Sequence, residues 1–471
     1  MSGAALYLRC SGCGAELELG HDRSPWRCPK AELFPEADHV MRRILGAPPT
    51  RWPEGSDANP YLRFREFFAA HHLAREGGSS DTEYLALAQD LDRRVAAIAG
   101  TGFVETPLTR ESRLAEALKL PGKLWIKNET KNVAGSHKAR HLFGVALWLE
   151  VAQRLGWFAV SPHLAVASCG NAALAAATLA KAGGWPLEVF VPTWASAEIV
   201  EALQELGARV CACPRIEGQK GDPCAHAFRE SVRAGRIPFS CQGPDNALSI
   251  EGGLSLGYEL VSQLGSREGG IDSIFVQVGG GALASACIQA FEEAHASSTW
   301  GKLPAFIMVQ SAGCYPLARA YDRVVAGVCR RLAVPRPEGR GYHAGFAREW
   351  AQRLLAPEAQ AAVKAELDHA AQHRSEYMQP WSEEPKSIAT GILDDETYDW
   401  LAVVRGMLKT GGFPLVVSEA ELGQAYRLAH ELTDIRASHT GAAGLAGLVH
   451  TQAREVPVGN TAIILTGIER D

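Results

Sequence analysis

From about residue 101 onward, short apolar runs alternate with longer helical runs along the chain. The apolar runs are typical of buried strands and lie at 124–129, 163–168, 187–192, 208–213, 274–278, 305–310 and 462–467. Helical patterns fill 137–155, 171–183, 196–206 and 282–295. This alternation predicts an α/β fold, in which parallel βαβ units form sheets with helices on both faces. Ligands in such folds bind beyond the carboxyl ends of the strands, so we expect the site residues there.

The first hundred residues follow a different pattern. Residues 1–30 contain cysteine and glycine and show few helix signals. Residues 31–100 are predicted to be mostly helical, with loops at 47–60 and 76–81. The sequence therefore predicts a separate N-terminal cap over 1–100, with a ribbon-like start and a helical remainder.

The bulk composition restricts the class of protein. A chain of 471 residues with 46% apolar and 21% charged residues suits a soluble globular protein of two or three domains. Its net charge of −6 argues against nucleic acid or an anionic membrane as the main partner. The sequence has no signal-peptide pattern and no membrane-spanning apolar run, and most of its eleven cysteines stand singly in apolar segments. These features predict a cytoplasmic protein with reduced thiols.

One lysine stands where a helix is predicted to begin. Lys138 follows Gly135-Ser136 in the segment 132–140. The first turn of a helix offers free N–H groups and a positive dipole end, which suits an anionic ligand and disfavours the ammonium form of a lysine. Lys138 is therefore a candidate amine nucleophile toward an aldehyde, and the alternative is an ordinary solvated lysine. Arg140, two residues further on, could meet a phosphate or join an ion pair.

Small residues join a predicted strand to an alanine-rich helix at 168–171. Such a turn brings backbone N–H groups close to a carboxylate or a phosphate. The Asn171 side chain could donate to a phenolate-type oxygen. The alternative is that Ser168 or Asn171 simply caps the helix.

Three glycines follow another predicted strand, at 279–281. They permit close backbone approach, and the next helix presents its N-terminus through Ala282 and Leu283, so the segment predicts a phosphate cup. A plain tight turn is the alternative. The dinucleotide and P-loop fingerprints are both missing. Thr466 ends the last predicted strand, where a lone threonine is usually structural.

In their order along the chain, these segments resemble the fold type II pyridoxal-phosphate enzymes, the tryptophan synthase β-subunit superfamily, and most of all its threonine synthase-like branch. The resemblance covers about 101–467. It rests on Glu105-Thr106-Pro107-Leu108, Lys127-Asn128-Glu129, Gly135-Ser136-His137-Lys138, Ser168-Cys169-Gly170-Asn171, Glu251-Gly252 and 387–392. It implies pyridoxal 5′-phosphate as the cofactor, a small amino-acid substrate and a homodimer. It also implies a large cofactor-binding domain formed by 101–140 and 261–471, with a small mobile domain at 141–260.

The resemblance also implies a role for each motif. Lys138 would carry the cofactor as a Schiff base and move the α-proton, and Asn171 would bond the cofactor O3′. The phosphate would lie against Gly279, Gly280, Gly281, Ala282 and Leu283. Thr466 would bond the pyridine nitrogen, which leaves the ring unprotonated and favours elimination or replacement. Ser168 and Asn171 would also hold the substrate carboxylate.

The implied function is elimination or replacement on an activated amino acid, through an aminoacrylate- or aminocrotonate-type intermediate. One alternative is a serine/threonine ammonia-lyase (deaminase), and another is a catalytically silent binding or regulatory subunit. The sequence departs from threonine synthases at His137, at Ala139, at 172–173 and after Thr466-Gly467. These departures argue against O-phosphohomoserine as the substrate.

Two smaller candidates remain. Cys10, Cys13 and Cys28 resemble part of a zinc ribbon, but Pro29-Lys30 stands where another cysteine is expected, and only His21 or His39 could complete the set. The spacing therefore favours a metal-free remnant, and no metal is predicted. His439, at a predicted helix start, could contact the substrate as a general acid or base, or be a structural histidine.

Overall fold

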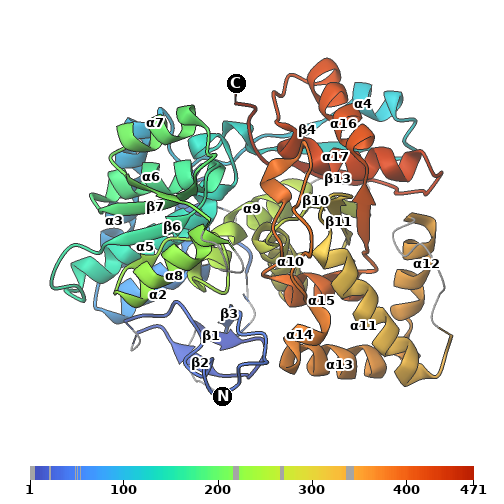
Figure 1. Cartoon of the computed structure of the whole chain (residues 1–471), viewed down its shortest axis with the longest axis horizontal. Helices are drawn as coiled ribbons and strands as arrows, with labels where there is room; N and C mark the ends of the chain where they lie inside the picture. Colours follow the sequence, from blue (N-terminus) through green and yellow to red (C-terminus); the bar gives the residue numbers. More distant parts are fainter. Residues whose placement is uncertain are drawn as a thin grey trace.

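The computed structural model describes residues 6–20, 23–47, 49, 51–53, 55–215, 222–265, 270–335 and 344–470, except the side chains of 344–346. Figure 1 shows two α/β units side by side, with a small N-terminal sheet below them. Each unit has its own sheet. The α/β fold predicted from the alternating pattern is confirmed.

The larger unit contains a six-stranded sheet in the order β12-β11-β10-β13-β5-β4. Its strands are β4 (Leu108–Arg110), β5 (Leu124–Asn128), β10 (Ser273–Gln277), β11 (Ala305–Ser311), β12 (Pro414–Val417) and β13 (Thr461–Leu465). All are parallel except β4, which pairs antiparallel with β5 at the edge. Every residue of β5, β10 and β13 is buried, as expected for central parallel strands with both faces covered.

Helices cover both faces of this sheet. Helix α17 (His439–Gln452) packs across four strands on one face and carries α16 (Glu419–Leu432) outside it. The other face is covered by α10 (Ala282–Ala296), α11 (Pro316–Leu332) and α15 (Trp400–Thr410). The outer helices of this unit are α4 (Ser112–Ala117), α12 (Ala344–Leu354), α13 (Pro357–Gln372) and α14 (Arg374–Tyr377).

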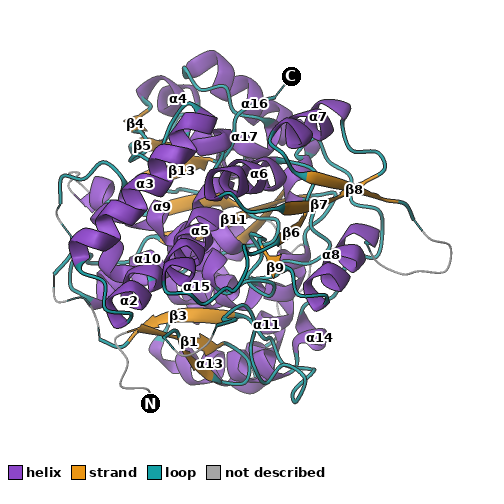
Figure 2. Cartoon of the chain, turned by 90° about the vertical axis from the view of Figure 1, so that its left-hand side faces the viewer, coloured by secondary structure: helices purple, strands orange, loops and turns teal. Residues whose placement is uncertain are grey.

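The second unit contains a four-stranded parallel sheet in the order β8-β7-β6-β9. Its strands are β6 (Leu164–Ala167), β7 (Leu187–Pro192), β8 (Arg209–Cys213) and β9 (Ile237–Pro238). They pack against the helices α6 (Asn171–Gly183), α7 (Ala197–Glu205) and α8 (Pro223–Arg233). Figure 2 shows this sheet nearly edge-on, with helices above and below it.

Two long helices connect the units. Helix α5 (Lys138–Arg154) packs against α6 and also against α9 (Leu248–Gly265), which in turn packs on α10 of the larger unit. The domain limits predicted at 140/141 and 260/261 therefore fall inside helices. A mobile domain at 141–260 stays a prediction.

The N-terminal region forms a three-stranded antiparallel sheet in the order β2-β1-β3. Its strands are β1 (Leu6–Cys10), β2 (Glu16–Glu18) and β3 (Met41–Leu45). The prediction that 31–100 is mostly helical is wrong for its first half, because β3 pairs along its whole length with β1 and buries Met41 and Arg43 on one side. Helices begin only at residue 60, with α1 (Pro60–Arg63), α2 (Ala69–Glu76) and α3 (Asp81–Ala99).

The ends of α3 follow from its sequence. Ser80 and Glu83 form a capping box at its start, and Gly100 ends it in the left-handed conformation at φ 76°. Within the described residues, no helix is long and apolar enough to cross a membrane.

Candidate active site

Three of the predicted site segments, the Lys138 loop, the glycine turn and Thr466, lie at the carboxyl edge of the larger sheet. Strand β13 lies between β10 and β5, so Thr466 follows the strand that separates the glycine turn from the Lys138 loop. Ser136 forms a β-bridge with Gly467, and the His137 backbone N–H donates to the Thr466 carbonyl over 3.0 Å. The loop that carries Lys138 is therefore bound directly to the strand end that carries Thr466.

The conformation of this loop is tightly specified. Ala134 and Gly135 both have left-handed backbone angles, with φ of 52° and 65°. A side chain at Gly135 would come within 2.6 Å of Ile468, so only glycine fits there. Asn132 Nδ2 donates to the Ser136 carbonyl over 3.0 Å, which closes the loop just before α5 begins. Lys138 is the first residue of that helix and is partly buried.

A fully buried ion-pair network lies beneath the loop. Arg140 Nε is 2.7 Å from Glu129 Oε2, and Arg140 Nη1 is 2.7 Å from Glu259 Oε1. Lys127 Nζ also bonds Glu259, and the Thr106 hydroxyl donates to Glu129. Burial alone would raise the pKa of Glu259, but Arg140 and Lys127 lower it below its usual value. Arg140 is thus an ion-pair residue, and these motif residues anchor the first turn of α5.

The three glycines form the turn between β10 and α10. Gly281 adopts φ 93° and caps α10, so the first N–H groups of that helix face the turn. The loop 392–399 lies directly on the turn. The Thr397 hydroxyl donates to the Gly279 carbonyl over 2.9 Å, and the Asp399 N–H donates to the Gly280 carbonyl over 2.9 Å.

A carboxylate from the same loop enters the turn. A Cβ built on Gly279 would lie 2.3 Å from Asp394 Oδ2, and one built on Gly280 would lie 3.7 Å from the same oxygen. Burial raises the pKa of Asp394, while the nearby Lys138 charge and the Gly280 N–H act in the opposite direction. The turn therefore holds a carboxyl oxygen of the chain itself.

Thr466 is oriented by a buried amide. Gln277 Nε2 donates to Thr466 Oγ1 over 2.7 Å and also to the Gly441 carbonyl over 2.8 Å. Because the amide donates, the Thr466 hydroxyl accepts from it and keeps its own proton for another acceptor. Thr466 is 2% exposed, so that acceptor has to lie inside the site.

Asn171, the first residue of α6, is held in one orientation. Arg470 Nε donates to Asn171 Oδ1 over 3.1 Å, and Arg470 also donates to the Ala134 carbonyl over 2.6 Å. The Asn171 NH₂ group therefore stays available as a donor. It lies close to Gly467, because a Cβ atom added to that glycine would be 3.0 Å from Asn171 Nδ2. Ser168 lies in the loop before α6, three residues before Asn171, and its hydroxyl accepts weakly from the Gly170 N–H at 3.4 Å.

The histidines of the region have different surroundings. The His137 ring contacts the Thr466 carbonyl through Nδ1 at 3.1 Å, and burial together with the Lys138 charge lowers the pKa of His137 well below its usual value. His137 is therefore neutral. The His439 ring stacks on Tyr426 at 4.0 Å between centroids, a contact outside the cluster just described. Its role toward a substrate stays a prediction.

Comparison with known proteins identifies the family. A family model described as "Pyridoxal-phosphate dependent enzyme" matches residues 101–340, just over half of the chain. This chain belongs to that family. Pyridoxal 5′-phosphate is the family's cofactor, and the matched range contains Lys138, Asn171 and the glycine turn.

Relatives of known name support the same assignment. "Serine dehydratase-like" from Mus musculus is 31% identical over 182 residues, which cover 38% of this chain and 49% of that protein. "L-serine dehydratase" from Saccharomyces cerevisiae is 27% identical over 261 residues, which cover 53% and 73%. Among solved structures, diaminopropionate ammonia lyase from Escherichia coli, in complex with an aminoacrylate-PLP azomethine reaction intermediate, aligns over 82% of this chain and 89% of its own, with a TM-score of 0.56 and 14% identity.

The residues of this pyridoxal-phosphate family member fit the cofactor at both ends. The Asp394 oxygen beside Gly279 marks the turn as a place that can receive an anionic oxygen. Helices α5 and α10 begin at this edge with Lys138 and Ala282, and α6 of the second unit begins with Asn171 after β6. The Thr466 hydroxyl offers a donor to a ring nitrogen that carries no proton. A phosphate in this turn would have to displace the Asp394 oxygen, which already lies against Gly279.

Several residues of the site are not predicted by the sequence motifs. Gln277, Asp394 and Arg470 contact the predicted site residues but belong to no recognised motif. Gln277 could have been found as the last polar residue of a buried strand before the glycines. Asp394 and Arg470 carry no local signal, because their positions depend on long-range folding. The three cysteines lie in the N-terminal region, outside this site, with Cys10 at the end of β1 and the other two in connecting segments. His21 lies outside the described residues.

Proposed function

We propose that the chain is a pyridoxal-phosphate-dependent ammonia-lyase for a small hydroxy amino acid of the serine or threonine type. The observation that carries this proposal is the match of the cofactor-binding region to serine dehydratases. The sequence resemblance favours a threonine synthase-like reaction and implies the ammonia-lyase as an alternative. The named relatives favour the ammonia-lyase. The match covers about half of the mouse relative's length. The proposed activity is therefore argued from the geometry of the site as well as from this similarity.

The chemistry of the site suits elimination. Bound pyridoxal phosphate stabilises negative charge at the α-carbon of an attached amino acid. Thr466 supplies a neutral hydroxyl, oriented by Gln277, where a carboxylate would protonate the ring. An unprotonated ring withdraws electrons less strongly, and this favours loss of a β-substituent over reactions that need a long-lived carbanion.

The residues of this chain would divide the work as follows. Lys138 would hold the cofactor covalently and, once released by the substrate, move the α-proton as a neutral amine. The N-terminus of α6, with Ser168 and Asn171, would bind the substrate carboxylate. Arg470 would keep the Asn171 amide oriented as a donor. The glycine turn would hold the phosphate.

A product assay tests the proposal. The holoenzyme is incubated with L-serine or L-threonine alone, and 2-oxo acid and ammonia are measured together. We expect equal amounts of both products with no second substrate. Lys138→Ala is expected to abolish turnover and borohydride fixation of the cofactor, whereas Lys181→Ala, at an exposed lysine in α6, is expected to keep both.

Two results would overturn the ammonia-lyase assignment. Turnover that needs a phosphorylated amino acid and an added nucleophile would indicate a replacement enzyme. Cofactor bound at Lys138 with no turnover of any amino acid tried would indicate a regulatory subunit.

A further inference from the structure

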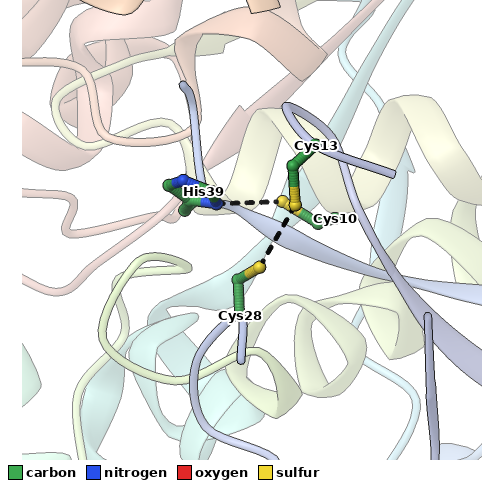
Figure 3. Close-up of side chains that lie close together, drawn as sticks. All are labelled: Cys10, Cys13, Cys28 and His39. Carbon is green, nitrogen blue, oxygen red and sulfur yellow. Dashed lines mark hydrogen bonds between the residues drawn. The ribbon is translucent and has the colours of Figure 1, made fainter. Parts of the chain in front are cut away.

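Three cysteines and one histidine meet in the N-terminal ribbon, defined here as residues 6–45. The ligand atoms of Cys10, Cys13, Cys28 and His39 all lie within 4.8 Å of one another. Figure 3 shows the four side chains pointing toward a common centre. The Cys10 sulfur is 3.4 Å from His39 Nδ1, and the Cys13 and Cys28 sulfurs are also 3.4 Å apart, too far for a disulfide.

From this geometry we propose that the ribbon holds one structural zinc ion. Zinc is bound in tetrahedral Cys₃His sites at about 2.3 Å from sulfur and about 2.0 Å from nitrogen, which sets neighbouring ligand atoms roughly 3.5–3.8 Å apart. The observed spacing needs only small side-chain shifts to reach this arrangement. Spacing along the sequence favours a metal-free remnant because Cys28 has no neighbouring cysteine, whereas the fold supplies His39 from 11 residues further on.

The hydrogen bond made by His39 suits a metal ligand. His39 Nε2 lies 2.8 Å from the Phe34 carbonyl, which can only accept a hydrogen bond. The proton of a neutral ring is therefore held on Nε2, and the Nδ1 lone pair faces the cysteines. Metal-bound histidines usually have such a partner on the second ring nitrogen.

One of the sulfurs also has a backbone partner. The Lys30 N–H donates to the Cys28 sulfur over 3.4 Å. Zinc binds cysteines as thiolates, so three thiolates and a neutral imidazole around Zn²⁺ would give the four-ligand site a net charge of −1. Four protein ligands leave no open position, so the site is structural.

A second group of possible ligands is less suitable. His369, His373 and Glu376 also lie close together, but all three are at least partly exposed. His369 Nδ1 bonds the Tyr377 hydroxyl at 3.0 Å, and His373 Nδ1 bonds the His369 carbonyl at 3.0 Å. These nitrogens already have partners.

The zinc would fix loops that reach the rest of the molecule. Asp38, next to His39, accepts from Trp400 Nε1 over 3.1 Å. The neighbouring Asp399 N–H donates to the Gly280 carbonyl in the glycine turn. The metal would thus stabilise the Asp38 segment, which packs on residues 399–400 next to the glycine turn.

Metal analysis of the purified full-length holoenzyme tests the proposal. We expect about one zinc per chain in wild type after removal of free metal, and a visible spectrum of tetrahedral thiolate coordination after exchange for Co²⁺. Cys13→Ser should lower zinc affinity by more than about 100-fold, because losing a ligand costs more than losing an outer partner. The matched control is Cys211→Ser, which removes a partly buried thiol from β8 and should retain the zinc.

A second measurement covers the case in which Cys13→Ser does not fold. Mercurial titration of wild type should release zinc into a coloured chelator in step with modification of three thiols. Wild type with less than about a tenth of a zinc per chain and no cobalt spectrum would overturn the proposal. A Cys13–Cys28 disulfide in the protein isolated under reducing conditions, or equal zinc loss in the Cys211→Ser control, would overturn it as well.

Discussion

Asp394 lies where the proposed site would place the cofactor phosphate, against the glycine turn. Asp394 Oδ2 lies 2.3 Å from the position of a Cβ built on Gly279, and the Lys138 charge acts to lower the Asp394 pKa. A phosphate ester carries close to two negative charges at neutral pH, so the two anions repel each other when both are near the turn. If the phosphate binds in this turn as proposed, Asp394 would compete with it for the same space.

Asp394→Asn is therefore expected to increase the affinity of the apoenzyme for pyridoxal phosphate. Removing one charge at a partly buried site should lower the dissociation constant by about 3- to 10-fold, which corresponds to about 0.7–1.4 kcal/mol. The measurement is a titration of apoenzyme with the cofactor, followed by absorbance. Asp395→Asn is the control, because it removes the same charge from the exposed neighbour. An unchanged or weaker affinity in Asp394→Asn would mean that the carboxyl supports cofactor binding.

At the scale of elements, helix α2 begins against a buried glutamate from α9. The Ala69 N–H, at the first position of α2, donates to Glu251 Oε1 over 2.5 Å. Burial raises the pKa of Glu251 to about 7, although Arg43 and this N–H both act to lower it. The side chain is thus protonated over a pH range in which the unfolded chain has lost the proton.

This raised pKa predicts a pH-dependent stability. The contribution of Glu251 is fully present below pH about 4.5 and is lost as the pH rises through about 7. Glu251→Gln keeps the acceptor for Ala69 and has no proton to lose. We expect the variant to gain about 2–3 kcal/mol of unfolding free energy relative to wild type between pH 5 and pH 8. Urea titrations at the two pH values measure this change.

The control for Glu251→Gln is Glu66→Gln, at an exposed glutamate before α2. Its unfolding free energy relative to wild type should be the same at both pH values. A Glu251→Gln variant with an equally constant difference would show that Glu251 is ionised across the range.

The parts of the fold and site that the sequence predicts are those encoded by neighbouring residues. The strands β5, β6, β7, β10 and β11 follow from apolar runs, and the Lys138 loop and glycine turn follow from small residues at strand ends. The strand β3 was missed because its pattern of alternating burial, with two arginines among five residues, resembles a helix face as much as a strand. Pairing with β1 decides between them.

The missing parts of the site depend on contacts between distant segments. Asp394 lies 114 positions from the Gly280 that it contacts, and Arg470 lies 299 positions from Asn171. Likewise, His39 joins the cysteine cluster only because β1 and β3 pair side by side. Contacts between segments so far apart cannot be predicted from the spacing of neighbouring residues.

At the scale of the whole molecule, the N-terminal ribbon touches both α/β units. Trp26 packs edge-on against the buried Trp148 of α5, with ring centroids 5.0 Å apart, and its carbonyl accepts from the Ala247 N–H before α9. On the other side, Asp38 bonds Trp400 of α15 and the Ala371 carbonyl of α13. The ribbon therefore links the units in addition to the connecting helices.

Trp26→Ala tests this link. We expect the free energy of unfolding to fall by about 2 kcal/mol, since a partly buried tryptophan loses both its apolar contact and its edge-to-face pair with Trp148. We also expect faster hydrogen exchange in α5, because Trp148 becomes more accessible. Trp194→Ala is the control, because Trp194 is 77% exposed and should change neither quantity. If Trp26→Ala destabilises the ribbon alone, with exchange in α5 unchanged, the ribbon is an appendage of the larger unit and does not link the two.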